Sequence, residues 1–311
     1  MIFVLSMNPS WDKTASIARF QLDAPNRIQP ERVDAGGKGV NVARVLRELG
    51  EETELIGFDF TGEPMKNAMA QEHVPCRLFP LNGEMRVNLK LRETETGRTI
   101  EINERGVTVT EEQIRTVLHG LLDAAKADAW YVLTGSLPPG APADTYRRFC
   151  SAIQAWGCAA AVDCDGEALK EAVQAKPALI KPNIQEFCGL TGVDPVDRQA
   201  VLDACRKLCF QGVGRVCLTW GGDGAWLVSG HGAWACGAAR IEARGTQGGG
   251  DTMLAALLTG LSRGMPDADA LRFASAAAAA TVMRPGTLLC QRVDVEALLP
   301  GITVQELNFC V

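Results

Sequence analysis

Three consecutive glycines, Gly248, Gly249 and Gly250, stand directly before Asp251 in the stretch 244–252. Glycines at the start of a helix let the backbone approach a ligand closely and leave several amide groups without partners. Such a turn suits a phosphate oxygen, because the helix dipole is positive at this end. A carboxylate here has a use if it accepts the proton of a hydroxyl that attacks the phosphate. The alternative is that Asp251 is an N-cap and the glycines form only a turn.

The element that must position Asp251 is a helix. Leu254, Leu257, Leu258 and Leu261 recur at the spacing that places apolar side chains on one helical face. The sequence therefore predicts a helix that begins at the glycines and buries this face.

A second glycine-rich loop lies far upstream, at residues 36–39, and precedes an amphipathic pattern that ends at Gly50. Lys38 and Asn41 belong to this region. A lysine and an amide within a glycine loop favour a hydroxylated or phosphorylated ligand over a plain tight turn.

The chain as a whole alternates strand-like and helix-like segments, which predicts an α/β protein with a parallel sheet. The predicted strands are residues 2–5, 130–133, 159–162, 178–181 and 216–219. Polar or glycine residues follow each of them. Ligands bind at the carboxyl ends of strands in open α/β sheets, so a site is predicted along this edge.

Asn183 and Glu186 follow the strand predicted at 178–181 and are three positions apart. One helical turn would bring both oxygen-bearing side chains to the same side. Hard oxygen ligands beside a phosphate site suit Mg²⁺, directly or through water. The alternative is a helix cap with an exposed carboxylate.

The helix predicted at 271–283 contains five consecutive alanines, at 276–280. Small side chains leave room for a flat ring to lie against the helix. Close packing of the helix on the sheet is the alternative explanation.

Residues 85–105 alternate apolar and polar side chains on both sides of a turn at 95–98, which predicts a β-hairpin. Arg86 shares a face with Asn88 and Lys90, since alternate residues of a strand point the same way. This face is either the solvated surface of a small accessory sheet or a place that binds a phosphate.

Composition excludes several classes of protein. The net charge of −6 and the pI near 5.3 argue against nucleic-acid binding, which normally requires a basic face. Eleven scattered cysteines without a C-x-x-C pair indicate reduced thiols in the cytoplasm, and three dispersed histidines do not suggest a metal cluster. Residues 1–6 lack a basic n-region and are interpreted as a first strand, not a signal peptide. No apolar run is long enough to span a membrane.

Together these motifs resemble the ribokinase/PfkB carbohydrate kinase family. Residues 248–251 and 36–41 are similar to the two signature regions of the family, 183–186 to its magnesium-associated motif, and 219–224 to its nucleotide-loop motif. The likeness covers residues 1–286 in the order usual for the family.

Within the family, residues 8–12, 86–88, 101–104 and 135–140 look like the phosphosugar branch. The Glu-Ile-Asn-Glu run at 101–104 favours fructose 1-phosphate as substrate, with tagatose 6-phosphate and fructose 6-phosphate as alternatives.

Three positions depart from the family pattern. Gly249 replaces the usual alanine, Gln247 stands at a position that is usually small or apolar, and Arg105 replaces a proline.

The resemblance implies one domain over residues 1–311, with a three-layer α/β/α core and a small β lid from about 13–34 and 85–105. It implies ATP and Mg²⁺ as cofactors, phosphoryl transfer to a phosphosugar, and a homodimer formed through the lid.

It also implies roles for individual residues. Asp251 would be the general base, and the amides of Gly248, Gly249 and Gly250 would stabilise the transferred phosphoryl group. Glu186 and Asn183 would hold magnesium or its waters, and Arg27 is a second candidate for the sugar's phosphate. The implied substrate-binding residues are Asp12, Gly36, Gly37, Lys38, Asn41, Arg86, Asn88 and Ser136. The implied nucleotide-binding residues are Lys181, Asn183, Thr219, Gly221, Gly224, Gly248 and Gly250, with the adenine near the alanine helix.

Other functions fit the sequence less well. An NAD-dependent oxidoreductase would need G-x-G-x-x-G after a strand and an acidic residue about 20 positions on, and a P-loop kinase would need G-x-x-x-x-G-K-[ST]; neither pattern occurs. A catalytically inactive sugar-binding protein on the same fold stays an alternative. The presence of both Asp251 and Glu186 favours an active enzyme over it.

Overall fold

The computed structural model describes residues 1–123, 128–239, 241–243, 245 and 247–307. Arg244 and Thr246, which belong to the glycine-rich stretch before Asp251, lie outside the described residues. The core is a ten-stranded sheet in the order β14-β13-β12-β11-β10-β9-β8-β1-β4-β5. Its strands are β1 (Ile2–Ser6), β4 (Thr53–Asp59), β5 (Cys76–Pro80), β8 (Trp130–Thr134), β9 (Ala159–Asp163), β10 (Leu179–Ile180), β11 (Arg215–Thr219), β12 (Ala225–Ser229), β13 (Gly232–Cys236) and β14 (Val304–Glu306).

The sheet is parallel from β5 through β11 and antiparallel from β11 to β14. The five strands predicted from the sequence are all present. The segment predicted at 178–181 is shorter than expected, since only Leu179 and Ile180 pair with neighbours.

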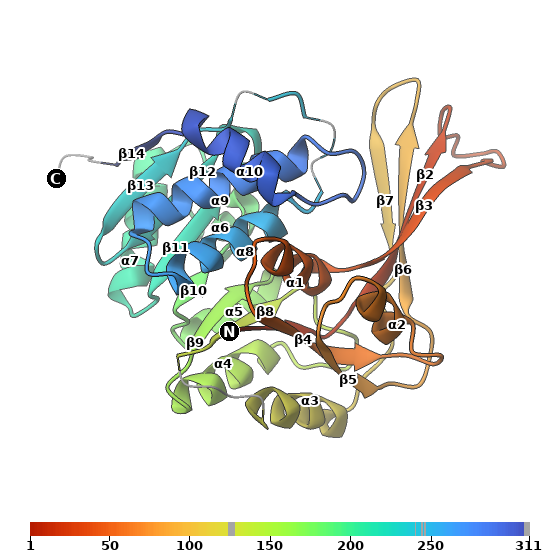
Figure 1. The fold of residues 1–311 in the computed structure, drawn as a ribbon, viewed down its shortest axis with the longest axis horizontal. Helices are drawn as coiled ribbons and strands as arrows, with labels where there is room; N and C mark the ends of the chain where they lie inside the picture. The colour runs from red at the N-terminus through yellow and green to blue at the C-terminus, as the bar shows by residue number, and fades with distance from the viewer. Residues whose placement is uncertain (124–127, 240, 244, 246, 308–311) are drawn as a thin grey trace.

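Helices cover both faces of the sheet, as Figure 1 shows. α1, α8, α9 and α10 contact one another in sequence on one side, and α3, α4, α5 and α6 do so on the other. The predicted three-layer α/β/α architecture is therefore confirmed. The helices are α1 (Lys38–Glu48), α2 (Pro64–Gln71), α3 (Glu111–Asp123), α4 (Thr145–Ala155), α5 (Gly166–Gln174), α6 (Ile184–Thr191), α7 (Arg198–Phe210), α8 (Gly249–Ser262), α9 (Asp267–Val282) and α10 (Arg292–Leu298).

Helix α8 is buried on nearly every side. From residue 249 to residue 260, every position except Gly250 is buried. The prediction of a single apolar face was therefore too narrow, because α8 lies between α1 and α9 and contacts both. Close approach to α9 requires Gly260, where a Cβ atom would lie 3.0 Å from the Cβ of Ala270.

A second, four-stranded sheet extends beyond the α/β body (Figure 1). Its order is β3-β2-β6-β7, and its strands are β2 (Ser10–Ile17), β3 (Gln29–Gly36), β6 (Arg86–Glu93) and β7 (Thr99–Asn103). The central strands β2 and β6 run parallel, and each outer strand is antiparallel to its neighbour. The predicted hairpin is thus present as β6 and β7. This four-stranded unit is called the small sheet below.

The ten cysteines in the described part of the chain are free thiols. Among the described helices, none is long and apolar enough to cross a membrane.

Candidate active site

A polar pocket of about 450 Å³, here called the first pocket, opens at the carboxyl-terminal edge of the parallel strands. Ser6, Thr134, Asp163 and Thr219 end four of these strands and line it. Lys181 follows β10 and lines it as well. The side chains converge because neighbouring parallel strands end at the same edge of a sheet.

Asp251 lies in the first turn of α8 and is 7% exposed. The N-cap of α8 is Gly248, whose φ of 72° is left-handed, so the alternative interpretation of Asp251 as the N-cap is wrong. The Asp251 carboxylate instead accepts a hydrogen bond of 2.8 Å from Asn41 Nδ2. Burial and the charge of Asp163 raise the pKa of Asp251, although the Asn41 hydrogen bond and Lys38 oppose them. A raised pKa makes the carboxylate a better proton acceptor.

Asp163 is buried between two lysines. Its carboxylate oxygens lie 3.1 Å from Lys38 Nζ and 3.2 Å from Lys181 Nζ. Burial acts to raise the pKa of Asp163, but the two lysines outweigh it and lower that pKa. Burial likewise acts to lower the pKa of Lys38, but the charges of Asp163 and Asp251 outweigh it and raise that pKa above its ordinary value. The floor of the pocket therefore holds two ammonium groups close to Asp251.

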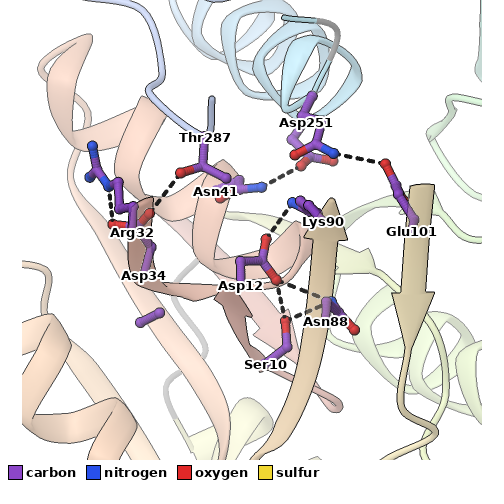
Figure 2. A network of polar contacts seen from close by, with 12 residues as sticks. Ser10, Asp12, Arg32, Asp34, Asn41, Asn88, Lys90, Glu101, Asp251 and Thr287 are labelled. Atoms are coloured by element: carbon purple, nitrogen blue, oxygen red, sulfur yellow. Dashed lines mark hydrogen bonds and ion pairs between the residues drawn. The ribbon is translucent and has the colours of Figure 1, made fainter. Parts of the chain in front are cut away.

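The small sheet forms another wall of the first pocket, and Figure 2 shows its polar network. Asp12 accepts hydrogen bonds from Ser10 Oγ at 2.8 Å and Asn88 Nδ2 at 3.1 Å. Its other oxygen lies 2.8 Å from Lys90 Nζ. Arg86, Asn88 and Lys90 all line the pocket, as expected for one face of a strand.

Arg86 is held at the pocket wall by carbonyl groups. Its Nη2 donates to the Asn8 carbonyl oxygen at 2.9 Å, and its Nη1 donates to the Glu104 carbonyl oxygen at 3.1 Å. These bonds fix the plane of the guanidinium. The face is a pocket wall and not a freely solvated surface.

Asn183 and Glu186 form a capping box at the start of α6. Asn183 Oδ1 accepts a hydrogen bond from the Glu186 amide, and Glu186 Oε2 accepts one from the Asn183 amide. The helix-cap interpretation is therefore correct as far as it goes. Both residues also line the first pocket, so capping does not exclude a further role.

A second pocket of about 570 Å³ meets the first at Asn183, Thr219 and Gly250, which line both. Its walls come from the loop after β11 and from α8 and α9. Ala278 and Ala279 line this pocket, whereas Ala276, Ala277 and Ala280 are buried in packing. Close packing therefore explains three of the alanines, and the other two border open space, where a flat ring stays a prediction.

Most residues proposed from the sequence line one of the two pockets. In the first are Asp12, Gly37, Lys38, Asn41, Arg86, Asn88, Ser136, Lys181, Asn183, Glu186, Thr219, Gly248, Gly250 and Asp251; in the second are Gly221, Gly224 and Gly249. Gly36 and Arg27 line neither. Gly36 instead makes room for Asp12, since a Cβ atom there would lie 2.4 Å from Asp12 Cγ. Arg27 lies in the loop between β2 and β3.

Sequence patterns gave no individual role to Asn8, Glu101, Asn103, Asp163 and Asp165, which line the first pocket. Asn8, Glu101 and Asn103 lie in the stretches that resemble the phosphosugar branch, and a local signal was present for four of the five. The two aspartates end or follow β9, at the sheet edge where ligands bind. Glu101 and Asn103 alternate along β7 on the face that meets the pocket.

Asp251→Asn should raise Tm near neutral pH. Because the pKa of Asp251 is raised, the folded protein holds this proton more tightly than the unfolded chain does. The contribution of Asp251 to the free energy of unfolding is greatest below its pKa in the unfolded chain. It is lost as the pH rises through its pKa in the folded protein. Asparagine avoids that loss and can still accept the Asn41 hydrogen bond. Thermal unfolding followed by circular dichroism tests this; the gain should shrink toward about pH 4, where unfolded aspartates are protonated. A lower Tm than wild type near neutral pH would contradict the expectation.

Comparison with known proteins gives the same assignment as the motifs. Residues 6–293 match the pfkB family of carbohydrate kinases. The chain is 30% identical to a 1-phosphofructokinase of Bacillus subtilis, over 99% of this chain and 100% of that protein. It is 30% identical to an ATP-dependent 6-phosphofructokinase isozyme 2 of Mycobacterium tuberculosis, over 95% of this chain and 88% of that one.

Among solved structures, phosphofructokinase-2 from Escherichia coli is similar with a TM-score of 0.91 and 27% identity, over 96% of this chain and 98% of that one. The family match, the two relatives and the shared fold agree along nearly the whole chain. This protein therefore belongs to the pfkB family of carbohydrate kinases.

Proposed function

We propose that the protein transfers the γ-phosphoryl group of ATP to a ketohexose phosphate, and that fructose 1-phosphate, converted to fructose 1,6-bisphosphate, is the preferred substrate. One observation carries the proposal. A buried carboxylate, Asp251, sits beside the amino terminus of a glycine-started helix, in a pocket whose wall also presents Arg86 and Lys90. A base, an anion site and cations for a second phosphate thus line one pocket.

The chemistry follows from these positions. A hydroxyl oxygen of the sugar attacks the γ-phosphorus, the bond from that phosphorus to the β,γ-bridging oxygen breaks, and ADP leaves. Asp251 accepts the hydroxyl proton, for which burial and its raised pKa suit it. The free amides at the start of α8, from Gly249 to Asp251, stabilise the charge on the transferred group.

Substrate recognition is assigned to the wall formed by the small sheet. Asp12 and Asn88 offer hydrogen-bond partners for sugar hydroxyls, and their mutual contacts keep both side chains in place. Arg86 and Lys90 supply positive charge for the phosphate already on the sugar. Relatives named 1-phosphofructokinase and 6-phosphofructokinase support a phosphorylated ketohexose in this place.

The nucleotide is assigned to the second pocket. Gly224, with φ of 100°, would place a Cβ atom 2.0 Å from the Cys236 carbonyl oxygen, so only glycine fits this turn. Ala278 and Ala279 leave a flat apolar wall for the adenine. The junction at Gly250 lets the phosphates reach Asp251, because both line the first pocket.

Mg²⁺ fits the chemistry of this site. The described residues contain no group of three or more His, Cys, Asp or Glu that could hold a metal by themselves. Magnesium beside a nucleotide is commonly held by one or two carboxylates, substrate phosphates and water. Glu186 lines the first pocket and uses only Oε2 in its capping bond. With Asn183 it would orient the ion or its waters, and the ion would neutralise charge on the phosphates.

Glu186→Gln should raise the Mg²⁺ concentration needed for half-maximal activity. Glutamine can keep the capping box, so the fold should survive, but a neutral amide holds a hard cation or its waters less well. Magnesium titrations of both proteins at fixed ATP measure the effect. A matched control is Glu167→Gln, an exposed glutamate in the first turn of α5 that does not line either pocket. Superimposable titrations for Glu186→Gln and wild type would remove Glu186 from the metal site.

The substrate panel tests the function as a whole. Fructose 1-phosphate, fructose 6-phosphate, tagatose 6-phosphate and free fructose are compared by kcat/KM with ATP and Mg²⁺. Fructose 6-phosphate is the second candidate, because the Mycobacterium tuberculosis relative is named for it. The highest value should belong to fructose 1-phosphate. Turnover of none of them would leave a sugar-binding protein, and a preference for free fructose would overturn the phosphosugar assignment.

The far face of the small sheet supports self-association. In register, Val33 pairs with Lys13, Lys13 with Leu89, and Leu89 with Ile102, so these side chains share the face opposite Asp12 and Asn88. Val33 is 53% exposed and Ile102 is 51% exposed. A second copy of the chain packed on this face would cover both. Sedimentation equilibrium, with a dimer at twice the chain mass of 33.3 kDa, tests the pairing.

A further inference from the structure

Two hydrogen bonds join side chains of the small sheet to the loops that flank α8 and α9. Glu101 on β7 accepts one of 2.7 Å from Gln247 Nε2, in the loop before α8. Asp34 on β3 accepts one of 2.7 Å from Thr287 Oγ1, in the loop after α9. Figure 2 shows Glu101 on its strand and the contact between Asp34 and Thr287. The two contacts differ in one respect: Glu101 and Gln247 line the first pocket, whereas Asp34 and Thr287 do not.

A carboxylate at the position of Glu101 is unexpected in a pocket that receives phosphate groups. Lys90 pairs with it across the strands, but the Lys90 ammonium lies 2.8 Å from Asp12. The partner that the structure gives Glu101 is the neutral amide of Gln247. Repulsion would make Glu101 a poor ligand for the phosphate groups themselves. Its contact with the core is the better explanation of its place.

Gln247 is joined by a peptide bond to Gly248, the N-cap of α8. The Gly248 backbone is left-handed, and its Cα faces Leu289, where a Cβ atom would lie 2.7 Å from Leu289 Cδ2. The turn is therefore confined on one side by packing. On the other side, the side chain of Gln247 holds it to the small sheet. A displacement of Gln247 would tilt the amides that the transferred phosphoryl group needs, and such misplacement is costly for catalysis.

We propose that Gln247 is a positioning residue that, through Glu101, couples the small sheet to the glycine turn at the start of α8. The inference rests on the proposed function of that turn. The contact carries the position of the small sheet to the amides beside Asp251. These amides are aligned for the phosphoryl group only while Glu101 holds Gln247.

A double-mutant cycle tests the coupling. Gln247→Met keeps the size of the side chain and removes the donor, and Glu101→Met removes the acceptor. Each single variant should lower kcat by about threefold to tenfold, which corresponds to the free energy that one hydrogen bond contributes. KM for ATP should change little. The double variant should be no slower than either single variant, because all three lack the same contact. Glu101→Gln, which retains an acceptor oxygen, should stay close to wild type.

Thr287→Val is the matched control, since it removes the other of these two hydrogen bonds. It should leave kcat unchanged, because neither Thr287 nor Asp34 lines the first pocket. The assay uses whichever sugar or sugar phosphate the wild type phosphorylates fastest, so an error in the substrate assignment does not affect it. Losses that multiply in the double variant, or a normal Gln247→Met, would overturn the coupling.

Amide hydrogen exchange gives a second readout that needs no turnover. The amide of Thr252 donates to the Gly248 carbonyl oxygen at 2.8 Å, so its exchange reports opening of the turn. It should exchange about threefold to tenfold faster in Gln247→Met than in wild type, and no faster in Thr287→Val. Unchanged exchange in Gln247→Met would overturn the proposal even if the protein proved to be a binding protein without kinase activity.

Discussion

Asp251→Asn should lower kcat by about 10²–10⁴-fold, the usual contribution of a positioned general base. Asparagine has the shape of aspartate and can accept the hydrogen bond from Asn41, but it cannot take the proton of the attacking hydroxyl. KM for both substrates should change little, since the pocket keeps its shape. Steady-state kinetics with saturating MgATP and fructose 1-phosphate measure the loss.

Asp269 provides a matched control for this substitution. It lies three positions after the N-cap of α9, as Asp251 does on α8, but it is exposed and outside both pockets. Asp269→Asn should therefore leave kcat unchanged. If Asp251→Asn turned over within about threefold of wild type, the carboxylate could not be the base, because a base contributes far more.

Arg86→Ala should lower kcat/KM for the phosphosugar by about 10- to 150-fold. A charge-assisted hydrogen bond from a guanidinium to a phosphate contributes roughly 1.5–3 kcal/mol, and each 1.4 kcal/mol is about tenfold. Use of free fructose, where it is measurable, should barely change, because that sugar has no phosphate to contact. The measurement is kcat/KM on fructose 1-phosphate, tagatose 6-phosphate and free fructose.

Arg92 supplies the control on the same strand. Arg92 lies on the same face of β6 as Arg86, but its side chain is exposed and does not line the pocket. Arg92→Ala should leave all three substrates unaffected. An equal loss on phosphorylated and free sugars in Arg86→Ala would show that Arg86 supports the loop of Asn8 and Glu104, whose carbonyl groups it holds, and not the phosphate.

Local patterns were enough to predict five strands of the main sheet, the hairpin of β6 and β7, and the polar face of β6. Alternation in β6 put Arg86, Asn88 and Lys90 on one side before any fold was known, because a strand has a fixed period of two. The glycines before α8, and the pair Asn183 and Glu186, were likewise recognised from patterns only a few residues long. In the second case the cap is confirmed and both side chains also line the pocket, while their role toward Mg²⁺ stays a prediction.

Contacts between distant segments could not be predicted in this way. Asp163 forms ion pairs with Lys38, which is 125 positions away, and with Lys181, which follows the neighbouring strand β10. Nothing near Asp163 in the sequence specifies that two ammonium groups will converge on it. Helix α8 shows the same limit: its leucines indicated one buried face, and only the neighbouring helices α1 and α9 explain why the other faces are buried too.

The parallel pairing of β2 with β6 has a consequence for the order of folding. It brings together residues as far apart as Asp12 and Asn88, 76 positions along the chain. The intervening chain contains α1, β4 and β5, whose partners lie in the main sheet. Closing so long a loop costs chain entropy, which is recovered most readily once the nascent main sheet has drawn its ends together. We therefore expect the wall that carries Asp12, Arg86 and Asn88 to form later in folding than the pairing of β1 with β4 and β5 in the main sheet.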